Sequence, residues 1–384
     1  MMNHNLPKQI GDYNKSRMMS LLRERGPTTR MALSRHLGIS PTAVTRSISS
    51  MLNNGIIREC GSEESDMGRK PVLIELCNDF CYILGADIVG GTIKTVLADL
   101  MGVIIKYNEE PFRHTENARS FMKQLIDALR KIINETGIPR EKIRTAVLGT
   151  PGIFDPEKGK SQFTFFLDGW DDVDIRAEIH NEFSIETIIE NDITLDLVGE
   201  SWMGVGRDYE NILYYKLGQG LGARIVIENR LLRGEHNLAG EVGYMLPGEP
   251  FPKNVNYEVL ICNEALVKKY CELNGKEKAA GLSDLCRLAY DGDTAARAAV
   301  DFALEHFVMV LLNSTIVVDP RIIVLGGDAC NFREKEIAFL KQKMDRYLPH
   351  TPKIITSKLS NKACLFGAIK TGLDRATERI AEIW

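Results

Sequence analysis

The chain has 384 residues, a length that favours two or three domains over a single hydrophobic core. Its apolar content of 44% and charged content of 26% are typical of a globular protein and exclude a disordered or fibrous chain. Residues 1–62 carry a net charge of +6, from nine Lys and Arg against three Asp and Glu. The whole chain carries −4, so −10 remains for the rest and only the basic head is expected to meet an anionic partner.

Three short helices are predicted in the basic head. Residues 14–26 carry an apolar pattern with helical spacing, and residues 28–38 begin with a threonine cap. The third helix has Ser40 as its cap and Pro41 in its first helical position. Each of the three is terminated by a glycine.

The third helix has one apolar and one polar face. Its apolar face holds Val44, Ile48, Met51 and Leu52. Its polar face is small and carries a single arginine. The tight turn over residues 38–40 joins it to the second helix as a helix-turn-helix, and the strands 56–60 and 71–76 then flank a polar loop. A helix-turn-helix followed by a β-hairpin predicts a winged helix.

The polar face and the wing supply the predicted DNA contacts. Arg69 and Lys70 lie near the return strand of the wing, within reach of a phosphate or the minor groove. The full predicted set is Arg30, Ser40, Thr42, Thr45, Arg46, Ser49, Arg69 and Lys70. The alternative is a three-helix protein-interaction module, but such a face more often carries large apolar anchors.

An α/β pattern begins at residue 82 and predicts two lobes. Three strands cover residues 82–107, and helices then alternate with strands to the C-terminus, which is predicted to end in two helices. The predicted domains are the winged helix-turn-helix of residues 1–78, a first lobe of residues 79–195 completed by the C-terminal helices of residues 362–384, and a second lobe of residues 196–361.

From residue 14 onward, nearly the whole chain resembles the ROK family of sugar kinases and sugar-responsive repressors. The resemblance rests on motifs that occur in order behind the winged helix: TPGIFDPEKG, ENDITLDLVGE, LGQGLG, NLAGEVGYM, VLGGD and KACLFGAIKTG. It implies a ribonuclease H-like, actin- or hexokinase-like body of two lobes that binds a sugar and forms a homodimer or homotetramer.

Three turns that bind ATP phosphates in the family's kinases are altered in this sequence. The first, DIVGGT, has Val89 in place of the first glycine and Gly91 in place of a threonine. The second has Gln219 between its glycines, and the third places Asp328 after a glycine pair, directed either to the nucleotide pocket or to solvent. Glycines let backbone N–H groups approach phosphates closely, so these changes indicate that ATP binding is lost and that the chain is not an enzyme.

The sugar-binding positions of the family are largely retained. The resemblance implies sugar contacts from Gly152, Asn191, Asp192, Glu241, Tyr244 and Glu258. Carboxylates suit this role because their oxygens accept hydrogen bonds from hydroxyls. Asp192 corresponds to the base of the kinases, and it is expected here to bind sugar without chemistry. The alternative is that the Asn191–Asp192 pair only caps the following helix.

Two departures distinguish the sugar side. Tyr244 replaces a histidine that binds sugar and zinc in the family, and the cysteines of that zinc site are absent, so no metal and no cofactor are expected. Phe166 replaces a sugar-contacting asparagine, where it either stacks on a sugar or closes the pocket.

The predicted function is a transcriptional repressor that binds operator DNA and responds to a sugar or sugar derivative. Two alternatives are an active ATP-dependent sugar kinase with a DNA-binding head, and a ligand-free scaffold controlled by a protein partner. The eight scattered cysteines contain no CxxC pair, the start of the chain is polar, and the longest apolar run is shorter than the roughly 20 residues that span a bilayer. A cytoplasmic location with no membrane partner is therefore expected.

Overall fold

The computed structural model describes residues 6–62, 71–89, 91–112, 117–155, 160–162, 169, 173–248, 255–275 and 279–383. Its elements group into two compact units. The first contains residues 1–148, 167–189 and 368–384, and the second contains residues 149–166 and 190–367. The sequence-based boundaries of one head and two lobes remain a prediction.

The head of the first unit is a winged helix, as predicted. Its elements are α1 (Leu6–Arg25), β1 (Thr28–Thr29), α2 (Arg30–Leu37), α3 (Pro41–Asn53), β2 (Ile57–Ser62) and β3 (Val72–Leu76), with the strands in the order β1-β3-β2. The predicted caps are present, because the hydroxyls of Thr29 and Ser40 accept from the backbone N–H groups of the first turns of α2 and α3. Gly38 ends α2 with φ 65°, a left-handed conformation that favours glycine.

A small apolar core holds these helices together. Met18, Leu33, Val44, Ile48 and Ile74 are fully buried and come from α1, α2, α3 and β3. Helix α3 therefore turns its apolar face to the core and leaves its opposite face to solvent. Residues 63–70 of the wing, with Arg69 and Lys70, lie outside the described residues.

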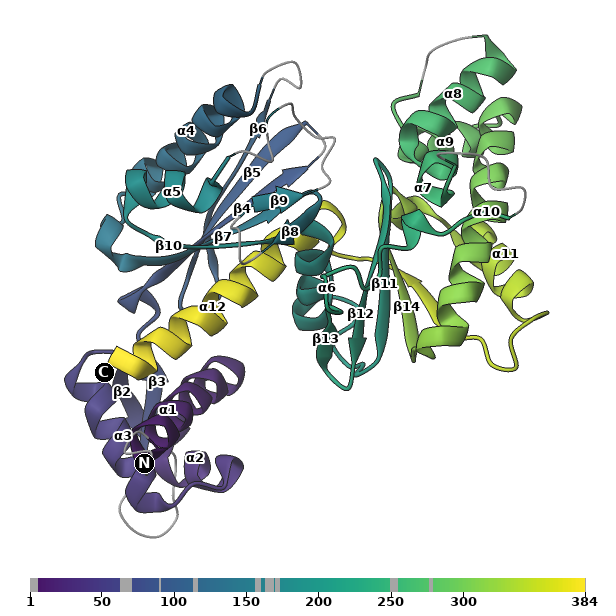
Figure 1. Cartoon of the computed structure of the whole chain (residues 1–384). Coiled ribbons are helices and arrows are strands. Elements are labelled where there is room, and N and C mark those ends of the chain that lie inside the picture. The colour runs from purple at the N-terminus through teal and green to yellow at the C-terminus, as the bar shows by residue number, and fades with distance from the viewer. Residues whose placement is uncertain are drawn as a thin grey trace. The chain divides into compact units, whose positions relative to one another are not determined.

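A five-stranded sheet forms the rest of the first unit (Figure 1). Its strands are β4 (Tyr82–Val89), β5 (Thr92–Asp99), β6 (Ile104–Pro111), β7 (Ile143–Thr150) and β10 (Glu186–Asn191), in the order β10-β7-β4-β5-β6. The helices are α4 (Ala118–Thr136), α5 (Ile175–Phe183) and, from Ala368 onward, α12 (Ala363–Ile383). Helix α4 packs on β5 and β6 through one apolar face, as its amphipathic sequence requires.

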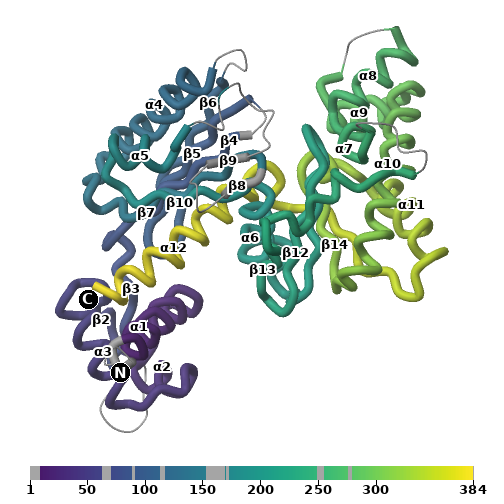
Figure 2. Tube along the Cα trace, viewed as in Figure 1, coloured from purple at the N-terminus to yellow at the C-terminus, as the bar shows by residue number. Residues whose placement is uncertain are grey.

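The C-terminus corrects one prediction, because it forms one helix where two were expected. Helix α12 is unbroken over 21 residues (Figure 2). The sequence Lys370-Thr-Gly-Leu-Asp374 at its middle suggests a break, but Lys370 donates to Asp374 one turn later. Gly372 packs directly against Ile83 of β4, where any side chain would collide, so this glycine serves close packing instead of ending the helix.

The second unit is built on a mixed sheet. Its strands are β11 (Ile212–Leu217), β12 (Leu221–Ile227), β13 (Arg230–Leu232), β14 (Ile322–Gly327) and β15 (Lys353–Thr356), in the order β13-β12-β11-β14-β15. A separate hairpin consists of β8 (Ile153–Asp155) and β9 (Lys160–Gln162). The helices are α6 (Asp192–Met203), α7 (Tyr257–Ile261), α8 (Asn263–Asn274), α9 (Leu282–Tyr290), α10 (Thr294–Val318) and α11 (Glu334–Met344).

The alternation of side chains along the strands separates two cores. Leu213 and Tyr215 of β11 pack in the core formed with the helices α7 to α11, whereas Ile212 and Tyr214 pack in the core formed with α6. Helix α10 is the core helix of the larger side. Among the described residues it alone is long and apolar enough to span a bilayer, but more than half of its apolar stretch is buried in the protein.

One buried carboxylate stabilises this larger core. Glu336 of α11 is 1% exposed and accepts hydrogen bonds from the hydroxyl of Tyr290, from Arg297 and from the backbone N–H of Arg333. Burial alone would raise the pKa of Glu336, but these hydrogen bonds outweigh burial and hold it below its ordinary value. Glu336 is therefore ionised, and it ties α11 to α9 and α10.

Candidate functional site

The exposed face of α3 carries the residues predicted to contact DNA. Thr42, Thr45, Arg46 and Ser49 are all exposed. Ser40 is also exposed, but its hydroxyl caps α3 by accepting from the N–H of Ala43 at 3.3 Å. Arg30 lies at the start of α2 and pairs with Glu59 of β2 at 3.3 Å, so a phosphate would compete with this carboxylate. Four of the six predicted residues that the structure describes thus form one polar surface on α3.

The predicted sugar residues lie in the second unit, around the junction of β10 and α6. Asn191 caps α6, because its side-chain oxygen accepts from the N–H groups of Ile193 and Thr194 at 3.0 and 3.1 Å. Its side-chain nitrogen donates to the carbonyl of Gly152 at 2.8 Å, which joins the TPGIF and ENDIT segments. Asn191 therefore caps α6 with its side chain, whereas Asp192 contacts other residues.

Asp192 is engaged by a lysine that the sequence analysis did not identify. Its Oδ2 lies 2.7 Å from Nζ of Lys216 in β11, and the same ammonium lies 2.8 Å from Oδ2 of Asp196. Asp192 and Asp196 lie one helical turn apart on α6 and are 6% and 4% exposed. Lys216 compensates two buried carboxylates that would otherwise repel each other.

A second basic residue, Arg224 of β12, holds Glu241. Its guanidinium donates from Nη2 to Glu241 at 2.8 Å and from Nε to the hydroxyl of Thr194 at 3.1 Å. Arg224 is 5% exposed, and its third bond goes to the carbonyl of Ala223. This arginine links the AGEVGY segment to the first turn of α6.

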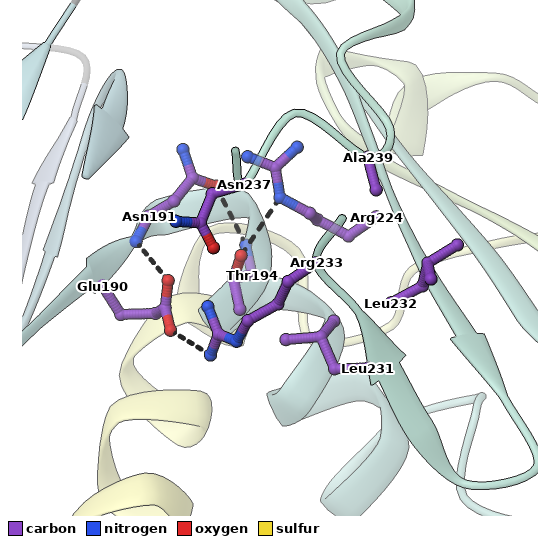
Figure 3. Close-up of a pocket in the computed structure, with 9 residues that line it drawn as sticks. All are labelled: Glu190, Asn191, Thr194, Arg224, Leu231, Leu232, Arg233, Asn237 and Ala239. Atoms are coloured by element: carbon purple, nitrogen blue, oxygen red, sulfur yellow. Dashed lines mark hydrogen bonds and ion pairs between the residues drawn. The ribbon is translucent and has the colours of Figure 1, made fainter. Parts of the chain in front are cut away.

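A small pocket lies beside this linkage (Figure 3). Its lining residues are Glu190, Asn191, Thr194, Arg224, Leu231, Leu232, Arg233, Asn237 and Ala239. Arg233 closes one side by pairing with Glu190 at 2.5 Å. The pocket volume is about 20 Å³, which is room for about one water molecule and too little for a sugar.

Glu258 and Tyr244 lie near Glu241. Glu258 accepts from the N–H of Leu221 at 3.0 Å and packs between Gly220 and Gly243, where a side chain at either glycine would crowd it. Tyr244 is 54% exposed. Burial, and then the negative charges of Glu258 and Glu241, raise the pKa of Tyr244, so its hydroxyl is protonated and able to donate a hydrogen bond.

Asp328 lies against the turn at Gly218, which corresponds to a phosphate turn of the family's kinases. Its Oδ2 accepts from the side-chain nitrogen of Asn263 at 2.7 Å, and the same oxygen would be 3.4 Å from a methyl group placed on Gly218. Of the two orientations considered from sequence, the structure thus shows the one toward the turn. Burial raises the pKa of Asp328, which indicates a carboxyl group partly removed from water. An ionised carboxylate here would repel a phosphate.

The basic residues Lys216, Arg224 and Arg233 were missed because their partners are distant in sequence. For Lys216 and Arg224 the sequence nevertheless contained an indication. Lys216 interrupts the apolar run ILYYKL, and Arg224 interrupts the apolar run LGARIVI. A charged residue inside a buried strand requires a buried partner of opposite charge. No cluster of three or more His, Cys, Asp or Glu with metal-binding geometry occurs within the described ranges, and Phe166 lies outside them.

Fold and site together define a DNA-binding winged helix joined to a body with the architecture of sugar kinases. Comparison with known families gives the same class for each part. The profile of the ROK family matches residues 83–373, and the profile described as winged helix-turn-helix DNA-binding matches residues 12–58. The chain belongs to the ROK family.

Individual relatives include regulators and kinases. The xylose repressor of Caldicellulosiruptor bescii is 24% identical over 96% of both chains. The crystal structure of a ROK family transcriptional regulator, described as a homolog of the E. coli MLC protein, covers 97% of this chain and 99% of its own with a TM-score of 0.82 and 19% identity. The ROK hexokinase of Thermus thermophilus covers 77% of this chain and 99% of its own, with a TM-score of 0.64 and 25% identity. The regulator therefore shares the head as well as the body, whereas the hexokinase covers a smaller share of the chain.

Proposed function

We propose that this chain is a transcriptional repressor whose ROK body binds a sugar or sugar derivative. The observation that carries the proposal is the presence in one chain of an exposed polar recognition helix and of carboxylates at the family's sugar positions, of which Asp192 is buried and Glu241 and Glu258 are half-buried. Relatives named as xylose repressors support the same function. We expect operator binding as a homodimer or homotetramer in the cytoplasm, because winged-helix and helix-turn-helix proteins commonly read two half-sites.

In this proposal α3 reads the major groove and the body binds the effector. Thr42, Thr45, Arg46 and Ser49 supply the base contacts, and Arg30, Ser40, Arg69 and Lys70 supply phosphate contacts. Asp192, Glu241 and Glu258 accept from the sugar hydroxyls, and Tyr244 donates to them. Asn191, which is held by Gly152, donates the second hydrogen of its side-chain amide. The effector acts by binding one state of the body more tightly than the other.

The second candidate is an ATP-dependent sugar kinase, which the position of Asp192 after β10 favours. Three features of the second unit oppose it. One oxygen of Asp192 is occupied by Lys216, so a sugar hydroxyl must use the other oxygen or displace an ammonium. Gln219 and Asp328 add an amide and a carboxyl group at two phosphate turns. We therefore propose that the body has no sugar kinase activity.

The test uses the full chain and a DNA fragment selected by it from a random library. Operator affinity is measured with and without each sugar of a pentose and hexose panel that begins with D-xylose, and ATP turnover is measured with the same panel. We expect at least one sugar to change operator affinity and no sugar to support turnover. Asp192→Asn should bind operator normally but lose the sugar response, because it replaces an acceptor oxygen by a donor at a cost of roughly 1.5–3 kcal/mol.

Each alternative gives a different result in this test. Turnover of ATP by the wild type, lost in Asp192→Asn, would establish the kinase. An unchanged sugar response in Asp192→Asn would limit this residue to a structural role. Operator binding that no sugar alters would favour control by a protein partner.

A further inference from the structure

The C-terminal half of α10 has an apolar face that remains exposed. Val317 is 82% exposed, Ile316 65% and Met309 44%, whereas Leu311 on the opposite face of the same helix is fully buried in the core of the second unit. A helix at the surface of a domain usually has one apolar face, the one that meets its own core. Because α10 has a second one, this second face is a candidate interaction surface.

The exposed apolar residues belong to one stripe along the helix. Successive residues of an α-helix are rotated by about 100°, so positions 305, 309, 313 and 316 lie on the same side, with position 317 beside them. Glu305 and Asn313 are exposed like the three apolar residues. We call the set of Glu305, Met309, Asn313, Ile316 and Val317 the α10 stripe.

Opposite charges lie at the two ends of the α10 stripe. At one end, the half-exposed carboxylate of Glu305 is bound by Lys343 of α11 at 2.8 Å. Arg321 follows the other end, between α10 and β14, and is exposed. Arg321 forms no ion pair with any residue that the structure describes, so its guanidinium is available to a carboxylate from another molecule.

These residues are arranged symmetrically about Asn313. Glu305 precedes it by eight positions and Arg321 follows it by eight, while Met309 precedes it by four and Val317 follows it by four. An antiparallel pair of α10 helices with a two-fold axis at Asn313 therefore brings Glu305 of each copy toward Arg321 of the other, and Met309 toward Val317. Each contact then occurs twice, as in every isologous interface. At the axis two Asn313 amides meet, and each has both a donor and an acceptor for the other.

We propose that the α10 stripe is the surface through which two copies of this chain associate, as an antiparallel pair of α10 helices. One copy supplies both signs of charge, so the surface is complementary to itself. A head-to-tail contact would leave one charged end of each stripe without its opposite. The inference deepens the proposed function, on which the expectation of a homodimer or homotetramer rests, by naming the face that associates. The association itself is measurable without sugar or DNA.

The first test measures the mass of the full chain by sedimentation velocity over a dilution series. The wild type should have at least twice the mass of one chain at micromolar concentration. Val317→Asp should weaken association by roughly tenfold or more, because it places a carboxylate in the apolar contact and near Glu305 of the second copy. Since Val317 is almost fully exposed within one copy, the circular dichroism spectrum should not change.

Leu273→Asp is the matched control for this variant. Leu273 lies in the last turn of α8, as Val317 lies in the last turn of α10, and it is 54% exposed. Both variants thus introduce the same carboxylate at the C-terminal end of a helix of the second unit, with the same effect on the helix dipole. Leu273→Asp should associate like the wild type.

A charge exchange tests the proposed pairing. Glu305→Arg and Arg321→Glu each bring like charges together between the two copies and should each weaken association. The double variant Glu305→Arg/Arg321→Glu restores opposite charges in exchanged places and should recover most of the loss. The two positions lie roughly 24 Å apart along one copy, so a direct effect of one on the other within the same chain would not give this recovery.

A cysteine at position 313 tests the symmetry axis. Packed helices lie about 8–10 Å apart with their Cα atoms at a radius of about 2.3 Å, so two facing Cα atoms are roughly 4–6 Å apart, a distance that a disulfide spans. Mild oxidation of Asn313→Cys should therefore link two copies through residue 313, as identified by mass spectrometry. Ala298→Cys is the control, because Ala298 is exposed on α10 but its two copies would lie roughly 45 Å apart.

The proposal is overturned if the wild type is monomeric, which would leave the α10 stripe to a different protein. It is also overturned if Val317→Asp associates like the wild type, if the charge exchange recovers nothing, or if Asn313→Cys links no more than Ala298→Cys. A monomer that binds operator and responds to a sugar would contradict this proposal alone. A dimer whose operator binding no sugar alters would contradict the proposed sugar response and leave the associating surface in place.

Discussion

Replacing Arg224 by methionine should destabilise the second unit, because it leaves a carboxylate of the proposed sugar site without its partner. Arg224 and Glu241 have side chains that are only 6% and 18% exposed, at a separation of 2.8 Å. Breaking a buried ion pair by removing one partner costs about 3–5 kcal/mol. Glu241 keeps some contact with water, so a cost near 3 kcal/mol is expected. For a unit of this size that corresponds to a fall in Tm of about 6–12 °C.

Differential scanning calorimetry of the full chain measures this effect. The double variant Arg224→Met/Glu241→Gln should recover about 1–2 kcal/mol, since the amide no longer leaves a buried charge unpaired. Arg230→Met is the control, because Arg230 is an exposed arginine of the neighbouring strand and its loss should change stability by less than about 0.5 kcal/mol. The role assigned to this pair would be refuted if Arg224→Met lost no more stability than the control. It would also be refuted if the stability changes of the two single substitutions summed to that of the double variant.

Three further outcomes are expected. Arg46→Ala should weaken operator binding by roughly 1–3 kcal/mol without changing Tm. As the control, Arg58→Ala on β2 should not reduce discrimination between operator and random DNA. Full operator affinity in Arg46→Ala would remove this residue from the recognition surface. The purified full chain should contain no stoichiometric zinc by elemental analysis after dialysis, and about one zinc per chain would contradict the reading of the Tyr244 segment. Because the folded pKa of Glu336 is depressed, its contribution to stability is present above its ordinary pKa near 4.5 and is lost as pH falls below that value. Denaturation measured from pH 7 to pH 3 should therefore give an unfolding free energy that depends less on pH in Glu336→Gln than in the wild type. The same pH dependence in both proteins would count against this role of Glu336.

The head could be predicted closely from sequence because its determinants are local. A cap hydroxyl, a proline in the first turn and a left-handed glycine act within a few residues, and Ser40, Pro41 and Gly38 have these roles in the structure. The apolar faces of the three helices then leave one compact arrangement, although α1 begins at Leu6, earlier than the predicted start at residue 14. The exposed face of α3 follows directly from the burial of Val44 and Ile48.

The helices and strands of the body could be predicted from the sequence, but most side-chain contacts between them could not. The carboxylates at positions 192 and 241 were identified as site residues, but the basic residues that pair with them lie on other strands. Sequence spacing contains no information on which strand faces which helix, so the partner of a buried charge was not identifiable. The same limit explains α12, where Gly372 suggested a helix end because Ile83, the residue that it packs against, is nearly 300 positions away.

The bridge between Lys216 and two aspartates makes the charges of the proposed sugar site depend on one another. Loss of Lys216 alone leaves Asp192 and Asp196 as buried neighbours of like charge, which lowers stability. Loss of either aspartate alone still leaves the ammonium one buried carboxylate as its partner. A substitution of Lys216 is therefore expected to cost more stability than a substitution of either aspartate, so the lysine is the least replaceable member of the three.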